Sequence, residues 1–403
     1  MADKPAVAGG KPLREELLPQ VKPSIKEDDK QAVEQVLDYD ILKDGPVVKE
    51  FEQEFARYVG ASYAYAVSSG PAGIHIALMA AAVGHMEEVI TSALVHPSTP
   101  SAIKHQGGMQ TFADIDPQTY NMDPQELRKV MSLRTVAVMP VHFAGRPCDM
   151  EAIADIAQEN QVEVIEDASH ALGAEFKGKK IGSISPLTVF SFDGPQGVYT
   201  GEGGMVVTDS EELHAWLSVF GSGGIVTERE RLLRSKEPWH FEMQDRGFYY
   251  RMNEMQAALG LRQLGRADWF LTRRREIAET YNHAFAGMQQ FFTPATFDDG
   301  KHAWYYYIIA LRPENLKATR LEIYNALRAE NIGVGVQHMP AHMHPYFKWV
   351  GHPDICNLEG SLAPKAEGLY DIFLSLPLFP AMSRQDADDV VEAIYKVMTY
   401  YAV

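Results

Sequence analysis

The chain alternates short apolar runs with longer segments of helical periodicity, and this alternation restricts its fold more than any other sequence feature. Short apolar runs predict buried strands, and the periodic segments between them predict helices that cover a mainly parallel sheet. We predict strands at 64–68, 88–90, 110–113, 136–141, 162–166, 187–192 and 204–208. Helices are predicted at 25–37, 48–58, 72–83 and 149–160. The fold class is therefore α/β.

The pattern changes after about residue 265. The charge-rich amphipathic segment 266–288 predicts a helix that links two domains. Beyond it, 303–311 predicts a buried strand, whereas 317–330 and 386–400 predict helices. We expect an N-terminal arm (1–22), a large α/β cofactor domain (23–265), and a linking helix with a small α+β domain (266–403).

Composition excludes several classes of function. A net charge of −17 argues against a surface for nucleic acid or anionic membranes. No signal peptide and no apolar run of about 18 residues is visible, so we expect no membrane span. Cys148 and Cys356 are far apart, which argues against a disulfide scaffold or a CxxC zinc site. We therefore expect a cytoplasmic protein.

Three segments carry residues that could bind a ligand or take part in catalysis. The turn Gly70, Pro71 and Ala72 begins a predicted helix, where backbone N–H groups can bind phosphate. An ordinary strand–turn–helix junction with Pro at its first position is the more common explanation of such a turn, and Pro71 has no N–H to donate. Asp167 and His170 follow a predicted strand, at the sheet edge where α/β proteins bind ligands. Asp167 suits the protonated ring nitrogen of a pyridine cofactor, although a helix-capping role is an equal alternative.

The third segment is a glycine-rich loop between the last two strands of the large domain. It contains Ser191, whose hydroxyl can donate to a phosphate, and glycines that allow close backbone approach. A tight loop between strands needs fewer glycines than this one has. Further along, His338, His342 and His344 are spaced like metal ligands. Prolines interrupt any helix that would align them, so we expect no metal site and place these histidines in a substrate cavity or a solvated loop.

Taken together, these segments resemble the DegT/DnrJ/EryC1/StrS family, the fold type I aminotransferases that act on nucleotide-linked keto sugars and cyclitols. The matching segments are LKDGPVVKEF (42–51), 67–78, VHFAGRPCDM (141–150), EDASHALGA (166–174), 191–209, YRMNEMQAALG (250–260) and LSLPLFP (374–380). The resemblance implies a sugar or sugar-nucleotide substrate and pyridoxal 5′-phosphate or pyridoxamine 5′-phosphate as cofactor. It also implies a homodimer with shared sites.

In this family the phosphate lies on the turn that matches Gly70, Pro71 and Ala72. A serine that matches Ser191 helps to bind it, and an asparagine of the second subunit reaches it from the position of Tyr249. Here that position is a tyrosine, and the family's threonine is Pro71. The resemblance thus implies a phosphate site with two altered positions.

The same resemblance places the cofactor ring between other residues. It puts Asp167 at the ring nitrogen, His170 at the ring hydroxyl, and His96 where the family has an aromatic residue that stacks on the ring. The lysine that carries the cofactor covalently lies five residues after the serine, and that position is Gln196. A primary amide neither forms an imine nor titrates near neutral pH. Ordinary transamination should therefore be slower by orders of magnitude, since acid–base catalysis contributes about 10²–10⁴-fold.

Three explanations of Gln196 remain open from the sequence. An enzyme of this kind can hold the aminated cofactor non-covalently and use another base, such as His170 or His96. The family's sugar 3-dehydratases, which have histidine at the lysine position, are a precedent. Alternatively, the chain is a cofactor-free binding or partner subunit, or an engineered lysine-to-glutamine variant of an ordinary aminotransferase. In the first case Arg246 and Arg251 are candidates for binding a substrate diphosphate.

Overall fold

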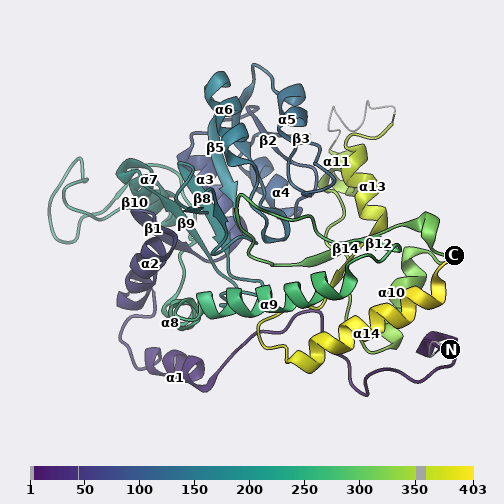
Figure 1. Cartoon of the computed structure of the whole chain (residues 1–403). Helices are drawn as coiled ribbons and strands as arrows, with labels where there is room; N and C mark the ends of the chain where they lie inside the picture. The colour runs from purple at the N-terminus through teal and green to yellow at the C-terminus, as the bar shows by residue number, and fades with distance from the viewer. Residues whose placement is uncertain (1–3, 44, 351–359) are drawn as a thin grey trace.

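A seven-stranded sheet forms the centre of the large domain in the computed structural model, which describes residues 4–43, 45–350 and 360–403 (Figure 1). Its strands lie in the order β1-β9-β8-β5-β4-β2-β3. They are β1 (Tyr63–Val67), β2 (Glu88–Ser92), β3 (Met109–Ala113), β4 (Thr135–Met139), β5 (Glu163–Asp167), β8 (Leu187–Ser191) and β9 (Gly204–Thr208). Only β9 runs against its neighbours in this sheet. The predicted mainly parallel sheet is confirmed.

Helices cover both faces of this sheet, because successive side chains of each strand point to opposite sides. Ala64 and Ala66 of β1 belong to one apolar core, and Tyr65 and Val67 belong to another. The first core contains residues of α2 (Pro46–Val59), α5 (Pro124–Val130), α6 (Met150–Asn160) and α8 (Glu254–Leu264). The second contains residues of α3 (Gly70–Ala80), α4 (Ser98–His105) and α7 (Glu211–Gly221). Helix α1 (Glu27–Val36) packs on α8.

The long helix α9 (Ala267–Phe285) leads from the part of the chain that carries the seven-stranded sheet into the C-terminal part, which we predicted to be a small domain (Figure 1). There, β12 (Phe291–Phe292), β14 (Tyr307–Leu311) and β15 (Phe373–Leu376) form an antiparallel sheet. A core of the small domain joins this sheet to α9, α10 (Arg320–Ala329) and α14 (Arg384–Tyr401), and includes Leu18 of the N-terminal arm. The predicted strand 303–311 is too long at its start. Tyr305 and Tyr306 lie outside β14 and face a cavity instead.

Short elements complete the described chain: η1 (Ala6–Ala8), η2 (Phe143–Gly145), β6 (Glu175–Phe176), β7 (Lys179–Lys180), β10 (Ile225–Val226), β11 (Glu242–Met243), β13 (Gly300–Lys301), η3 (Pro313–Asn315), η4 (Ala341–Met343) and α11 (Pro345–Trp349). Cys148 is buried, whereas Cys356 and the first three residues of the predicted arm lie outside the described residues. Every helix in the described ranges is too short or too polar to cross a bilayer.

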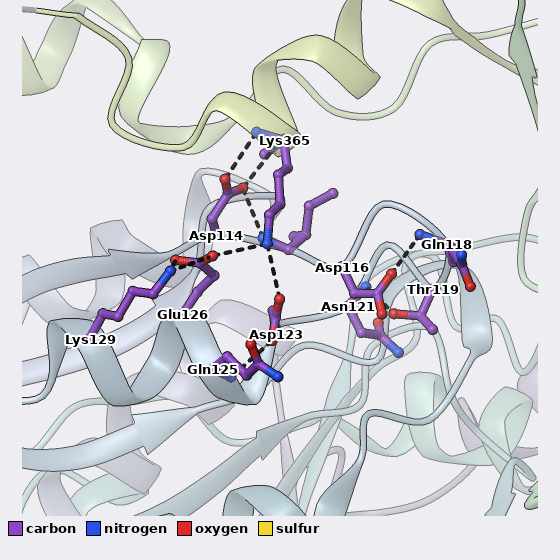
Figure 2. Close-up of polar contacts among 12 residues, drawn as sticks. Asp114, Asp116, Gln118, Thr119, Asn121, Asp123, Gln125, Glu126, Lys129 and Lys365 are labelled. Atoms are coloured by element: carbon purple, nitrogen blue, oxygen red, sulfur yellow. Dashed lines mark hydrogen bonds and ion pairs between the residues drawn. The ribbon is translucent and has the colours of Figure 1, made fainter.

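Helix α13 (Pro364–Ile372) of the small domain begins on an acidic side chain of the large domain (Figure 2). The carboxylate of Asp114 accepts hydrogen bonds from the backbone nitrogens of Lys365 (2.9 Å) and Ala366 (3.0 Å). The Lys365 ammonium lies 3.0 Å from Asp123 and 2.9 Å from Glu126, at the start of α5. First-turn N–H groups have no partner within their own helix, so a carboxylate there satisfies them and complements the helix dipole. These contacts hold α13 against the edge of the large sheet.

Candidate active site

A cavity of about 210 Å³ lies at the carboxyl ends of the parallel strands, and Tyr305, Tyr306 and His338 from the C-terminal part of the chain complete its wall. Asp167 and Ser191, the last residues of the neighbouring strands β5 and β8, both line it. The lining residues are Gly70, Pro71, Ile74, Val95, His96, Ser98, Thr99, Val141, Phe143, Asp167, Ser169, His170, Ser191, Asp193, Tyr305, Tyr306 and His338. The structure thus brings together Gly70, Pro71, His96, Asp167, His170 and Ser191, six of the residues predicted from sequence.

The carboxylate of Asp167 is buried and held on both oxygens. The hydroxyl of Thr99 donates to Oδ2 over 2.8 Å. Oδ1 accepts from the hydroxyl of Ser169 over 2.6 Å and from its backbone nitrogen over 3.2 Å. A carboxylate fixed in this way is oriented before any ligand arrives. The sequence did not identify Thr99 or Ser169, although Ser169 stands within the EDASH motif.

The start of α3 and Ser191 meet at another end of the cavity. A Cβ atom on Gly70 would lie 2.7 Å from Cβ and Oγ of Ser191, so only glycine fits this close approach. The Ala72 N–H already donates to the Ser69 hydroxyl over 3.2 Å, and Pro71 has no N–H. Ser191 itself donates to the carboxylate of Asp193 over 2.8 Å. This end therefore offers an anion fewer free donors than the turn alone suggests, and it carries an acidic side chain.

Three histidine rings form part of the cavity wall. The His338 ring lies 5.2 Å from His96 and 6.1 Å from His170, between ring centroids. Burial lowers the pKa of His170 well below its usual range and, together with the neighbouring His96, lowers the pKa of His338 to about 4. Both rings are therefore neutral near pH 7 and able to accept a proton. His170 also stacks on Tyr305, with centroids 4.3 Å apart.

The other two histidines of the 338–344 segment have different surroundings. His342 is buried, and its Nε2 lies 2.7 Å from Glu367 of α13. His344 is partly exposed and does not line the cavity. Within the described ranges, no three His, Cys, Asp or Glu side chains are grouped as a metal site requires. Only His338 of the three lies at the cavity.

Gln196 is almost fully buried, with 2% of its surface exposed, but does not line the cavity. Its main-chain oxygen accepts a hydrogen bond from Arg274 over 2.5 Å. Its side chain hydrogen-bonds the hydroxyl of Tyr306, while Oε1 is buried without a partner in the described structure. No lysine is present among the cavity-lining residues given above. The described cavity wall therefore offers no amine to hold a cofactor covalently.

Ala72 and Tyr249 do not line this cavity either. Ala72 is buried in the first turn of α3, where its N–H serves the helix cap. Tyr249 is 70% exposed, in the segment that leads to α8, and pairs with Ser222 in an isolated bridge. Its ring lies 5.5 Å from the guanidinium of Arg251. A role for Tyr249 at a cofactor site requires a second subunit.

Known proteins resemble this chain over nearly its whole length. The model of the DegT/DnrJ/EryC1/StrS aminotransferase family matches residues 23–395. The spore coat polysaccharide biosynthesis protein SpsC of Bacillus subtilis is 41% identical over 387 residues, 96% of this chain and 98% of SpsC. Helicobacter pylori PseC, an aminotransferase involved in the biosynthesis of pseudoaminic acid, superposes with a TM-score of 0.87 at 25% identity, over 96% of this chain and 100% of PseC. An aminotransferase from Psychrobacter cryohalolentis gives 0.88 at 28% identity, over 96% and 99%.

Proposed function

The chain belongs to the DegT/DnrJ/EryC1/StrS aminotransferase family, and from that premise we propose that it binds a B6 phosphate cofactor without a covalent bond. Its substrate in this proposal is a keto sugar or cyclitol, most simply a nucleotide-linked sugar. One observation carries the proposal: Asp167 is oriented by Thr99 and Ser169 in a cavity whose described wall contains no lysine. The relatives SpsC and PseC, which serve polysaccharide and pseudoaminic acid biosynthesis, support a role in sugar biosynthesis.

The residues of the cavity fit pyridoxamine phosphate better than a covalently bound cofactor. Asp167 would accept a hydrogen bond from the protonated ring nitrogen, and Ser191 with the Gly70 turn would hold the phosphate. His170 has a buried Nδ1 without a partner in the described chain, which supports a contact with a bound polar group. When bound, the aminated cofactor supplies an amino group and an electron sink. Gln196 does not fit a covalent attachment, because its amide nitrogen is not a nucleophile.

The histidines supply the acid–base function that glutamine cannot. His170 and His338 are neutral near pH 7 because burial lowers both pKa values, so each imidazole has a free lone pair for a proton of the substrate. The lowered pKa makes each a weaker base than an exposed histidine. His338 comes from the small domain and His170 from the large one, so they approach the cavity from different walls. In this proposal one of them performs the proton transfer that lysine performs in an ordinary aminotransferase.

A homodimer is part of the proposal. Tyr249 is exposed, and the segment between β10 and β11, which precedes it, extends away from the body of the molecule (Figure 1). This segment exposes the large apolar side chains of Leu233, Trp239 and Phe241, and β11 exposes that of Met243. Exposed apolar side chains gathered on one segment are typical of protein interaction surfaces. They support an arm that packs on a second copy and brings Tyr249 to the partner's cavity.

A second candidate function is a cofactor-free binding or partner subunit. It is favoured by the phosphate end of the cavity, where Pro71 lacks an N–H and Ser191 donates to Asp193. A carboxylate at this place repels a phosphate, and it would suit a neutral or cationic group instead. The two candidate functions therefore differ in whether the phosphate group strengthens or weakens binding.

Calorimetric titration of the purified protein with pyridoxamine phosphate and pyridoxal phosphate tests the proposal. We expect saturable binding of pyridoxamine phosphate, and no mass increase of the protein after treatment with pyridoxal phosphate and borohydride. A borohydride-fixed mass increase in the protein without substitutions would contradict the non-covalent mode. Failure to bind either compound would favour the cofactor-free subunit. Gln196→Lys is the companion variant, and we expect it to gain a borohydride-fixed adduct with pyridoxal phosphate.

A further inference from the structure

Arg274 is a charged side chain of the linking helix α9 that lies inside the protein, directly behind the cofactor cavity. Only 3% of its surface is exposed. Its Nη1 donates to the main-chain oxygen of Gln196 over 2.5 Å, and its Nε is buried without a partner in the described structure. Burial lowers the pKa of Arg274 to about 10, and its titratable neighbours Tyr305 and Tyr58 are neutral near pH 7. No carboxylate among the described residues forms an ion pair with it.

A buried guanidinium without a counter-charge is unfavourable, because its desolvation is only partly offset by hydrogen bonds. The hydrogen bond to Gln196 is the one polar contact that the described structure gives this side chain. A main-chain carbonyl accepts this bond whatever residue stands at position 196. The contact therefore fixes the backbone at this position and not a particular side chain.

The loop that carries position 196 is packed tightly on the same side. A Cβ atom on Gly194 would lie 1.5 Å from the Tyr305 hydroxyl, and one on Gly197 would lie 3.5 Å from Nη1 of Arg274. Gly194, Gly197, Arg274 and Tyr305 surround a space of about 20 Å³, the size of one water molecule. The walls of this small space and of the cofactor cavity share Ser169, His170, Ser191 and Tyr305. The Arg274 side chain is thus separated from the cofactor cavity by a single layer of side chains.

We propose that Arg274 is the positioning residue for position 196. Helix α9 holds the loop between β8 and β9 through the carbonyl of Gln196, so that the side chain at 196 starts from the same backbone position whether it is glutamine or lysine. This inference rests on the proposed function only for the identity of the ligand in the adjacent cavity. This contact explains why the loop is closely packed although residue 196 forms no covalent bond to a cofactor in the proposed function.

The test uses Gln196→Lys as a reporter of where the side chain at 196 points. We expect this variant to form a borohydride-fixed adduct with pyridoxal phosphate. Adding Arg274→Met should slow adduct formation by about tenfold or more, since a hydrogen bond to a charged group is lost. The affinity for pyridoxamine phosphate, which needs no residue at 196, should change by less than about threefold. Adding Arg274→Lys instead should restore part of the adduct rate, because one donor is retained.

The control is Arg275→Met in the same Gln196→Lys background. Arg275 is the next residue of α9, carries the same charge, and makes no polar contact in the described chain. We expect its adduct rate to match that of Gln196→Lys alone. Equal rates in the Arg274→Met and Arg275→Met variants would overturn the proposal. So would a parallel loss of pyridoxamine phosphate affinity in Arg274→Met, because that result indicates general damage to the cavity.

Amide hydrogen exchange tests the positioning role of Arg274 independently of the proposed function, because it needs no ligand. If the natural protein and Gln196→Lys bind neither cofactor, the proposed function fails, but the anchoring of the loop can still be measured. Arg274→Met in the natural sequence should then speed amide exchange at Gly197 and Thr200 by about tenfold, whereas Arg275→Met should not. Unchanged exchange in Arg274→Met would overturn the positioning role without reference to any ligand.

Discussion

The hydroxyl of Thr99 donates to Oδ2 of Asp167 over 2.8 Å and joins the start of α4 to the end of β5. Ser169 holds the other carboxylate oxygen from the loop that follows β5. The start of α4 and the loop after β5 therefore orient this carboxylate from one edge of the sheet. A charge held in a fixed direction favours one defined partner, and in the proposed function that partner is a protonated pyridine nitrogen.

Asp167→Asn should weaken pyridoxamine phosphate binding by about 10- to 100-fold, since hydrogen bonds to charged groups contribute about 1.5–3 kcal/mol. The amide keeps the shape of the side chain but loses its charge. Calorimetry on folded protein measures the change. Asp193→Asn is the matched control at the other end of the cavity, and it should not weaken binding. An equal loss in both variants would contradict the assignment of Asp167 to the ring.

Pro71→Thr should strengthen pyridoxamine phosphate binding, because it adds a backbone N–H and a hydroxyl at the start of α3. We expect a gain of about tenfold, equivalent to about 1.4 kcal/mol. Unphosphorylated pyridoxamine, measured by the same titration, should gain nothing. If both compounds gain equally, the phosphate does not lie on the turn at Gly70.

Much of the fold follows from local sequence patterns. The helix predicted at 149–160 is α6 (Met150–Asn160), and the strand predicted at 204–208 is β9 (Gly204–Thr208). Buried strands and amphipathic helices leave a periodic signal, and that signal survives in a single sequence. The segment 303–311 misled the prediction, because aromatic residues at its start are as apolar as a strand but line a cavity.

Only the site residues that lie next to predicted strand ends in the sequence could be predicted. Asp167, His170 and Ser191 stand beside the ends of predicted strands, so their place at one sheet edge followed from the fold class. Arg274 and Tyr306 reach position 196 from segments 78 and 110 residues away along the chain. Nothing in a single sequence pairs residues at such separations. The resemblance supplied the remaining positions, and it also identified Gln196 as the altered one.

The protein should become less stable at acidic pH, because its buried histidines take up protons when it unfolds. The pKa of His338 is lowered by burial, and then by His96 and His344, to about 4. An unfolded chain has its histidines near 6.5, so it binds more protons than the native state between these values. The free energy of unfolding should therefore decrease as the pH falls from about 6.5 to about 4. His338→Gln removes one such group.

Urea unfolding of His338→Gln and of the parent protein between pH 4 and pH 7 measures this contribution. In the variant, the free energy of unfolding should decrease less as the pH falls. The difference in slope between the two proteins should correspond to about one proton taken up on unfolding. Burial also lowers the pKa of His75 to about 4 and of His302 to about 3, so part of the decrease remains. Parallel curves for the two proteins would show that His338 does not titrate on unfolding.

Asp114 joins the two domains, and its replacement tests how much this junction contributes (Figure 2). Asp114→Asn keeps one acceptor for the first turn of α13 but loses the charge that complements the helix dipole. We expect a loss of about 1–2 kcal/mol in the free energy of unfolding, as for a helix N-cap. Asp116→Asn is the control, since in the described chain the Asp116 carboxylate accepts a hydrogen bond only from the backbone of Gln118, within its own turn.

Lys365→Met separates the charge pair from the cap. Its ammonium pairs with Asp123 and Glu126, but 36% of the Lys365 side chain is exposed, and exposed ion pairs contribute about 0–1 kcal/mol. The losses measured in urea should therefore decrease in the order Asp114→Asn, Lys365→Met, Asp116→Asn. Because α13 also carries Glu367, the partner of His342, Asp114→Asn should weaken pyridoxamine phosphate binding slightly through the loop that bears His338. A larger loss in Lys365→Met than in Asp114→Asn would mean that the ion pairs, and not the backbone cap, hold the domains together.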